Sequence, residues 1–148
     1  MSVRLLTRVT LWFRWIAANN GQTWLLFGIR RPCGHDGELF AFAGLWDRSK
    51  DPSGQWIKSC SILTTTPNAV TSSVHDRMPV ILDRGDYDLW LDPGMTKVEA
   101  VADLLKPYDA RTMRSYPVSS RVNHVANDDA ECSLPIELIP IQTQTTLF

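Results

Sequence analysis

The residues of this chain best suited to chemistry lie in the run His75-Asp76-Arg77-Met78-Pro79. A histidine side chain exchanges protons near neutral pH, and an arginine guanidinium binds phosphate oxygens through its planar set of N–H donors. Because Pro79 disfavours a helical conformation at Met78, the run predicts a change from helix to an extended segment, Val80-Ile81-Leu82. We therefore expect His75 at a helix-to-strand junction, where side chains are often presented to a cleft.

Each of these side chains also has an ordinary structural explanation. The imidazole of His75 could simply be held by a backbone carbonyl group. The guanidinium of Arg77 could form a salt bridge with Asp76 or Asp83. Asp76 itself is better suited to orient or cap a neighbouring group than to act as an acid catalyst.

Tryptophans form a second set of candidates. Trp46 and Trp56 could stack on unpaired bases, and such stacking contributes about 1–3 kcal/mol per base. A tryptophan in a strand of alternating pattern is more often part of the core, and the sequence favours the core for both residues. Trp90, which precedes Leu91 on an apolar face, is predicted to be buried.

Nothing in the sequence indicates a metal or a cofactor. Cys33 and His35 supply two ligands in a loop, whereas zinc needs three or four well-placed ligands. The three cysteines are an odd number without CxxC spacing, which favours a reducing cytosol and no disulfide framework. We expect a cytoplasmic protein, associated with the nucleoid if the source is bacterial.

The bulk composition sets wide limits. A chain of 148 residues predicts one domain, and a hydrophobic fraction of 44% supports a packed core. The sequence has no run of 18 apolar residues, so no transmembrane helix is expected. The net charge of -1 is unevenly spread: residues 1–35 carry five arginines and no acid, and residues 122–148 carry four acids and no Lys or Arg. A basic segment can attract phosphate, or it can be an ordinary solvated face.

Strand patterns outnumber helix patterns along the chain. Thr66-Pro67 predicts the start of a short helix that runs to about Val74, and Asp83 predicts a capped turn that runs to Leu91. Thr96 to Glu99 fits a capping box for a further helix, which Pro107 ends. The mixed order predicts an α+β fold: a mixed, mainly antiparallel β-sheet or open barrel-like core with short helices. The expected strands cover residues 9–15, 24–29, 40–46, 56–64, 80–82, 116–119 and 136–139.

Five runs of the chain, taken in order and spacing, resemble the SRAP family, the SOS response-associated peptidases that process abasic sites. They are Ala41–Trp46, Ser61–Thr66, His75–Pro79, Asp88–Pro93 and Pro117–Asn123. The resemblance covers about residues 36–138. It implies a partial SRAP fold, with residues 1–148 forming a single truncated domain that lacks the N-terminal catalytic part.

The resemblance implies a role in the DNA damage response. Proteins of the family sense abasic sites in single-stranded DNA, form a covalent thiazolidine link to them and have a self-processing peptidase activity. By position, His75 would assist proton transfer during opening of the abasic sugar, and Thr64 would hydrogen-bond the sugar or phosphate. Arg77 would contact the DNA backbone, Arg121 is a further candidate of the same type, and Trp46 is a candidate for contact with DNA. Thr64 could also be an ordinary hydroxyl at a strand end.

The chain departs from the family pattern at the residue that starts the chemistry. The family uses a cysteine exposed by removal of the initiator methionine, and this sequence has Ser2. The alignment also places Arg14 where the family has a glutamate that moves protons. We therefore expect no crosslink, or a very weak one, and we leave open whether the chain is an enzyme of the hydrolase or lyase kind.

Two other functions remain open at this point. The chain could be a catalytically inactive remnant that binds single-stranded DNA through Arg77 and the basic N-terminal segment. It could also be a small-molecule hydrolase that uses His75, although the sequence shows no paired nucleophile. A partial fold would leave strand edges unpaired, so we expect marginal stability and self-association.

Overall fold

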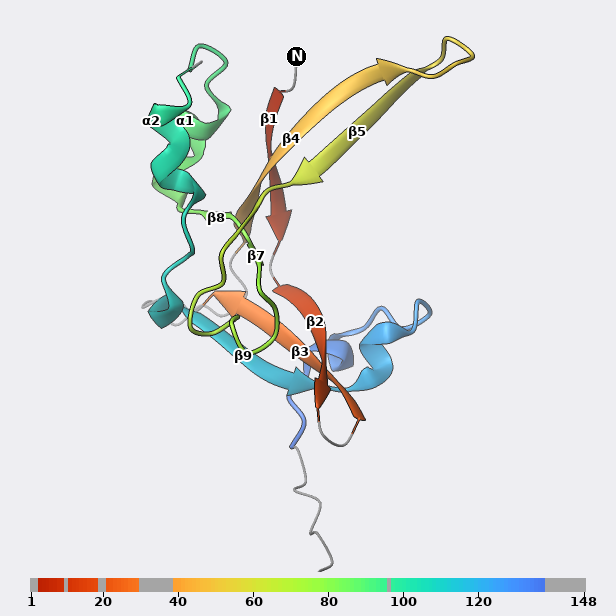
Figure 1. Ribbon diagram of the computed structural model, residues 1–148. Helices are drawn as coiled ribbons and strands as arrows, with labels where there is room; N and C mark the ends of the chain where they lie inside the picture. The colour runs from red at the N-terminus through yellow and green to blue at the C-terminus, as the bar shows by residue number, and fades with distance from the viewer. Residues whose placement is uncertain (1–2, 10, 19–20, 30–38, 96, 138–148) are drawn as a thin grey trace, which may run out of the picture. The chain divides into compact units, whose positions relative to one another are not determined.

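The computed structural model describes residues 3–9, 11–18, 21–29, 39–95 and 97–137 (Figure 1). They belong to two compact units, Met1–Leu11 with Gly28–Arg114 and Trp12–Phe27 with Ser115–Phe148, called here the first and the second unit. Within the described ranges, no helix is both long enough and apolar enough to cross a membrane. The expectation of one domain over residues 1–148 stays a prediction.

The first unit is built around the long strand β4, Phe40–Lys50. On one side β4 pairs antiparallel with β1, Val3–Val9, and on the other side with β5, Trp56–Ile62. The short strand β8, Ile81–Leu82, also pairs antiparallel with β4, opposite Ala41 and Phe42 (Figure 1). β4, β5 and β8 fall where hydrophobic and β-branched residues predicted strands, but β4 runs on to Lys50, beyond the predicted end at Trp46. The strand β1 was not predicted, because the first expected strand covered residues 9–15.

Three segments meet in the first unit through a closed ring of backbone hydrogen bonds. The amide of Ala43 donates to the carbonyl of Val80, that of Val80 to Leu63, and that of Leu63 to Ala43, each at 2.9 Å. From Gly44 onward β4 pairs with β5, and before Ala43 it pairs with β8 through Ala41 and Phe42. The chain after Leu63 therefore leaves β4 as β6, Thr64–Thr65, which pairs antiparallel with β7, Met78–Pro79.

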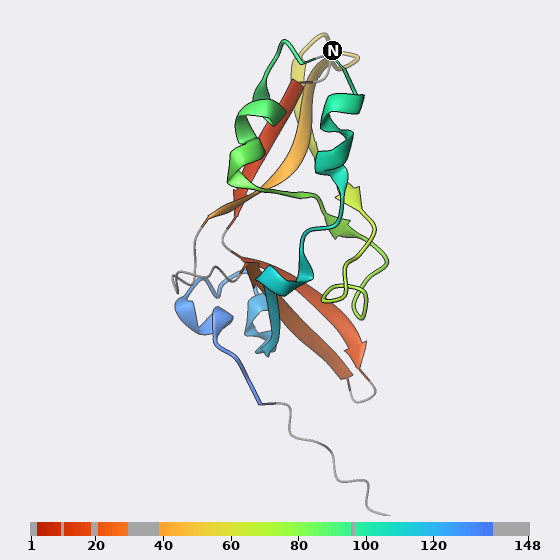
Figure 2. The ribbon, with the colours of Figure 1, turned by 90° about the vertical axis from the view of Figure 1, so that its left-hand side faces the viewer.

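Short helices cover one face of this sheet (Figure 2). The 3₁₀ turn Arg84–Asp86 leads into α1, Tyr87–Leu91, and α2, Glu99–Ala102, continues as the 3₁₀ turn Asp103–Leu105. Trp90 is 2% exposed and packs in one cluster with Ala43, Val80, Leu82 and Val101, which confirms its predicted place in the core.

The predicted ends of the helical segments are partly confirmed. The turn predicted from Asp83 to Leu91 is present, but the Asp83 side chain makes no capping hydrogen bond. Lys106, which precedes Pro107, is extended and ends the second helical segment as expected. Thr96 lies outside the described residues, so the capping box stays a prediction.

The helix predicted from Thr66 to Val74 is wrong. The structure has consecutive turns over Ala69–Val74 instead. The side-chain oxygen of Asn68 accepts hydrogen bonds from the amides of Val70 and Thr71, at 3.0 and 3.1 Å. An asparagine side chain that binds local amides in this way favours a turn over a continuing helix.

The second unit contains most of a three-stranded sheet in the order β2-β3-β9. Its strands are β2, Leu11–Ala18, β3, Gly21–Ile29, and β9, Met113–Val118, and the 3₁₀ turn Ala110–Thr112 precedes β9. Two more 3₁₀ turns follow, Ser120–Asn123 and Ala130–Ser133. Of the strand predicted for residues 136–139, residues 136 and 137 are not in a strand, and residues 138 and 139 lie outside the described residues. Pro135, just before them, forms an isolated bridge with Val118.

The α+β expectation is confirmed. The helices are short, and the pairings of β4 with β1, β5 and β8 and of β6 with β7 are antiparallel. In the part of the chain that the structure describes, the strands form separate sheets and do not close into a barrel.

Candidate functional site

Two of the predicted site residues, Thr64 and Arg77, are in direct contact. The pairing of β6 with β7 brings the segments on either side of the turns together, with Thr64 opposite Pro79. The Nε of Arg77 donates to Oγ1 of Thr64 at 2.8 Å, and a terminal nitrogen of Arg77 donates to the Thr64 carbonyl at 3.1 Å. Among the described residues, Arg77 forms no salt bridge with Asp76 or Asp83, so neither structural alternative for Arg77 applies there.

The contact leaves hydrogen-bond donors available for a ligand. A guanidinium has five N–H donors, and two of them are used on Thr64, which leaves three. The Thr64 hydroxyl accepts from Arg77, so its own proton is free to be donated. Both residues are exposed. An anchored guanidinium beside a hydroxyl donor is well suited to bind phosphate oxygens.

The imidazole of His75 lies next to the same group. Its Nδ1 is 3.0 Å from the backbone nitrogen of Arg77 and 2.8 Å from Oδ1 of Asp76. One nitrogen cannot serve both contacts at once: a neutral Nδ1 accepts from the Arg77 amide, and a protonated Nδ1 donates to Asp76. The amide contact is the better defined, since its hydrogen position is fixed by the backbone, whereas the Asp76 side chain is 87% exposed. Nδ1 of His75 thus has a hydrogen-bond partner whether or not it carries a hydrogen.

Asn68 positions the segment that carries His75, and the sequence analysis missed it. Besides holding the turns, its amide nitrogen donates to the carbonyl of Tyr108 at 2.7 Å. Thr71 is 4% exposed, and its carbonyl accepts the amide of His75 at 3.1 Å. The signal was an asparagine directly after Pro67, a place where a side chain often replaces a backbone hydrogen bond.

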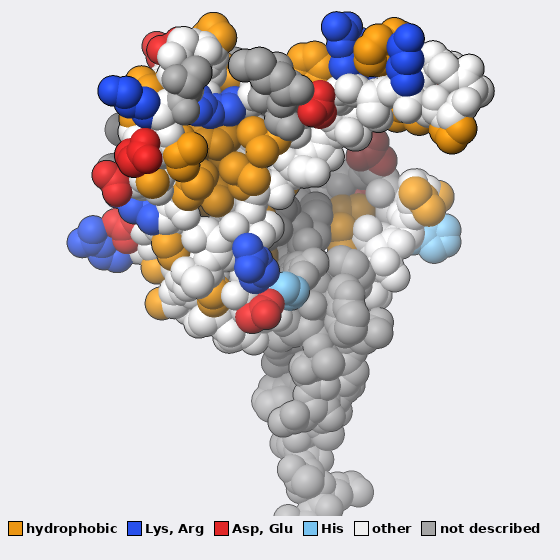
Figure 3. Space-filling view, turned by 45° about the horizontal axis from the view of Figure 1, so that its top comes forward, with side chains coloured by type: hydrophobic (Ala, Val, Ile, Leu, Met, Phe, Trp, Pro, Cys, Tyr) orange, Lys and Arg blue, Asp and Glu red, His pale blue; other side chains and the backbone are white. Residues whose placement is uncertain are grey.

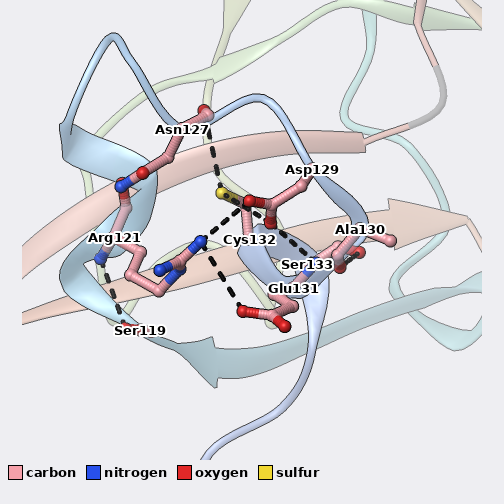
Figure 4. Close-up of polar contacts among 8 residues, drawn as sticks. All are labelled: Ser119, Arg121, Asn127, Asp129, Ala130, Glu131, Cys132 and Ser133. Carbon is pink, nitrogen blue, oxygen red and sulfur yellow. Dashed lines mark hydrogen bonds and ion pairs between the residues drawn. The ribbon is translucent and has the colours of Figure 1, made fainter.

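Trp46 and Arg121 are two further predicted DNA contacts. Trp46 is half-buried on β4, opposite Cys60 of β5. Arg121 belongs to the second unit, where its guanidinium lies 2.8 Å from a carboxylate oxygen of Asp129 and 3.6 Å from one of Glu131 (Figure 4). The predicted role of Trp46 and Arg121 in DNA binding stays a prediction.

The core assignment of Trp56 is wrong. Its side chain is 56% exposed on β5, and all seven residues of that strand are exposed. The alternating sequence suggested a strand with one buried face, but in the structure solvent reaches both faces of β5.

A cavity of about 470 Å³ lies in another part of the first unit. It is lined by Asp83, Asp103 and Tyr108, among others, and by none of the residues of the Thr64–His75–Arg77 cluster. Within the described residues, no three side chains of the metal-ligating types come together. Cys33 and His35 lie outside those residues.

Comparison with known proteins addresses the resemblance seen in the sequence. The profile of the SOS response associated peptidase (SRAP) family matches residues 2–125. The chain belongs to the SRAP family. The runs that carried the resemblance in the sequence fall within the matched region, and so do Thr64, His75 and Arg77.

Relatives in the SRAP family share much of this chain. The abasic site processing protein YoqW of Bacillus subtilis is 45% identical over 93 residues, which are 63% of this chain and 42% of YoqW. The abasic site processing protein HMCES of Gallus gallus is 34% identical over 111 residues, 73% of this chain and 32% of HMCES. The chain thus matches less than half of the length of either relative.

Solved structures show the same fold. A protein from Bacteroides thetaiotaomicron superposes with a TM-score of 0.78 at 24% identity, over 91% of this chain and 57% of that protein. A protein from Bordetella bronchiseptica gives a TM-score of 0.66 at 25% identity, over 78% of this chain and 55% of that protein.

Proposed function

We propose that this SRAP chain binds single-stranded DNA at abasic sites through Thr64, His75 and Arg77. The observation that carries the proposal is the anchored guanidinium of Arg77, which keeps three N–H donors beside the exposed Thr64 hydroxyl and the His75 imidazole. The names of the relatives YoqW and HMCES, both abasic site processing proteins, support the choice of substrate.

Each residue has a separate role in this proposal. Arg77 and Thr64 hold a phosphate next to the lesion, because a planar guanidinium and a hydroxyl supply converging donors. His75 moves a proton at the abasic sugar, where ring opening transfers hydrogen from the C1′ hydroxyl to the ring oxygen. Nδ1 of the imidazole can donate to Asp76 when it carries a hydrogen and accept from the Arg77 amide when it does not.

Covalent attachment is a separate question from recognition. Among the described residues, the contacts of the cluster are with hydroxyl, carboxylate and backbone groups. These groups support binding and proton transfer. The crosslinking and peptidase reactions stay predictions for this chain, as does the expectation from Ser2 that a crosslink is absent or very weak.

Binding to two single-stranded oligonucleotides that differ only in one stable abasic analogue would test the proposal. We expect tighter binding to the abasic strand, and a loss of at least about ten-fold for Arg77→Gln, since one charge-assisted contact contributes about 1.5–3 kcal/mol. Lys97→Gln, at an exposed position of the first unit, is the matched control.

Two results would count against the proposal. Equal affinity for intact and abasic strands would favour the alternative, a DNA-binding module that does not sense the lesion. An Arg77→Gln variant that binds DNA as tightly as Lys97→Gln would show that Arg77 does not contribute to DNA binding. A denaturing gel with a natural abasic site, run in parallel, tests for a covalent adduct.

A further inference from the structure

Beyond Trp46, β4 and β5 form a two-stranded ribbon. The pairing of β1 with β4 reaches Trp46, where Val3 lies opposite, while the pairing of β4 with β5 continues to Lys50 and Trp56. Within the described residues, this part of β4 therefore has β5 as its one neighbour. Figure 1 shows the pair extending past the end of β1.

The two faces of the ribbon differ in chemistry. Arg48 lies opposite Lys58, and Lys50 lies opposite Trp56, and residues directly opposite each other share a face. One face thus carries Arg48, Lys50, Trp56 and Lys58, called here the basic ribbon face, and no acid lies on this face of the ribbon. The opposite face carries Asp47, Ser49, Ile57 and Ser59.

Two of the three cations of the basic ribbon face, Arg48 and Lys50, lie against Trp56. The guanidinium carbon of Arg48 lies 4.8 Å from the centre of the Trp56 ring, and Nζ of Lys50 lies 5.1 Å from it. Cation–π contacts of this kind orient the charges without neutralising them. Figure 3 shows Lys and Arg side chains beside hydrophobic ones on the projecting hairpin. The exposure of Trp56 is explained by this arrangement.

The turn between the strands is itself well ordered by hydrogen bonds. The carboxylate of Asp51 accepts from the Ser53 hydroxyl at 2.6 Å and from the Gln55 amide at 2.8 Å, and these bonds lower the pKa of Asp51. Gly54 has a φ of 86°, which other residues rarely adopt. The nearby acid is thus engaged in the turn, and the ribbon keeps its shape without a ligand.

We infer that the basic ribbon face is a phosphate-binding arm that holds DNA at a distance from the abasic site. Three cations on a preformed ribbon complement a polyanionic strand better than a protein surface of mixed charge. β5 leads through Leu63 directly into Thr64, so Lys58 lies up to about 20 Å from the cluster, at ~3.3 Å per residue. The inference rests on the proposed function for the identity of the polyanion as DNA.

The test compares two double variants that remove the same charge. Lys50→Gln with Lys58→Gln alters the basic ribbon face, and Lys97→Gln with Lys106→Gln removes two exposed lysines outside it. Affinity for an intact single strand is measured over a range of salt concentrations. Each lost phosphate contact reduces the salt slope by about 0.7, so we expect a slope smaller by about 1.4 and affinity about 20-fold weaker at 0.1 M salt.

The control and conservative variants complete the test. The control pair should bind like the parent chain, and Lys50→Arg with Lys58→Arg should restore both slope and affinity. A single Lys58→Gln change should lower the slope by about 0.7. An oligonucleotide too short to span about 20 Å should bind the parent and the ribbon variant equally, given the ~3.3 Å rise per residue.

The outcomes separate this inference from the proposed function. A ribbon variant that binds like the control pair overturns the inference, even where preference for abasic DNA remains. It is also overturned if the ribbon variant loses self-association in sedimentation while DNA binding is unchanged, because the face would then bind a second copy of the chain. Ribbon-dependent binding without preference for abasic DNA supports the arm and refutes the proposed function.

Discussion

Arg77 reaches across the β6–β7 pair to donate a 2.8 Å hydrogen bond from Nε to Oγ1 of Thr64, a residue thirteen positions earlier in the chain. This bond fixes the plane of the guanidinium. The sequence predicted that this hydroxyl hydrogen-bonds the sugar or phosphate. In the structure it also accepts the hydrogen bond that orients the Arg77 guanidinium. Thr64 and Arg77 therefore form one binding unit.

Thr64→Val should weaken binding to abasic single-stranded DNA by about five-fold, because an exposed hydrogen bond contributes about 1 kcal/mol and the guanidinium loses its orientation. Thr64→Ser keeps the hydroxyl and should bind like the parent chain. Fluorescence anisotropy with a labelled oligonucleotide measures both. Equal affinities of the two variants would contradict a role for the Thr64 hydroxyl, because only Thr64→Ser retains it.

Asn68→Ala should lower the free energy of unfolding by about 2–3 kcal/mol, since three side-chain hydrogen bonds to backbone groups are lost and each contributes about 0.5–1.5 kcal/mol. The bonds at risk are those to Val70, Thr71 and Tyr108. Urea denaturation followed by circular dichroism gives the change. Ser72→Ala, in the same turns but exposed, is the control, and an equal effect of the two would exclude a special role for Asn68.

Asp129 and Glu131 compete with a DNA phosphate for one terminal nitrogen of the Arg121 guanidinium. In the structure its guanidinium is 2.8 Å from Asp129, in an exposed ion pair of the kind that contributes about 0.2–1 kcal/mol (Figure 4). Asp129→Asn should therefore raise DNA affinity by up to about five-fold. Titration of single-stranded DNA into this variant and into Arg121→Gln measures it. Unchanged DNA affinity in both variants would show that Arg121 does not bind DNA.

Asp109 provides a prediction on acid stability. The side-chain hydrogen bonds from Arg111 lower the pKa of Asp109 from 3.8 to about 2. A depressed folded pKa means that this carboxylate stabilises the fold above about pH 4 and loses the effect as pH falls toward 2. Carboxyl carbon chemical shifts recorded by NMR should show Asp109 titrating near the lower value. Arg111→Gln should return the midpoint toward the ordinary one, and a midpoint unchanged by that substitution would contradict the assigned cause.

Hydrophobic pattern and proline positions predicted much of the first unit. Trp90 was expected in the core because apolar neighbours surround it in sequence, and burial in the structure agrees. Lys106 was expected to end a helix because a proline follows, and its extended backbone agrees. The family assignment rested on motif order, which the profile match over residues 2–125 confirms.

The same patterns did not predict which residues contact each other in the folded chain. Trp56 and Trp90 both belong to runs rich in apolar residues, yet only Trp56 lies on a ribbon with no layer above it. The turns at Asn68 replace a helix because the side chain binds both local amides and a carbonyl far away in sequence. The Arg77–Thr64 contact depends on strand register, which sequence spacing alone does not specify.

The ring of hydrogen bonds among Ala43, Leu63 and Val80 has a consequence for how the chain tolerates change in length. Residues added at the exposed turn around Gly54 would extend the hairpin and leave everything after Leu63 in register. A single residue added between Ile62 and Thr64 would break the ring and turn the Thr64 hydroxyl to the other side of its strand. A fluorescent label or an affinity tag is therefore best inserted at the turn, where the hairpin can lengthen independently of the cluster.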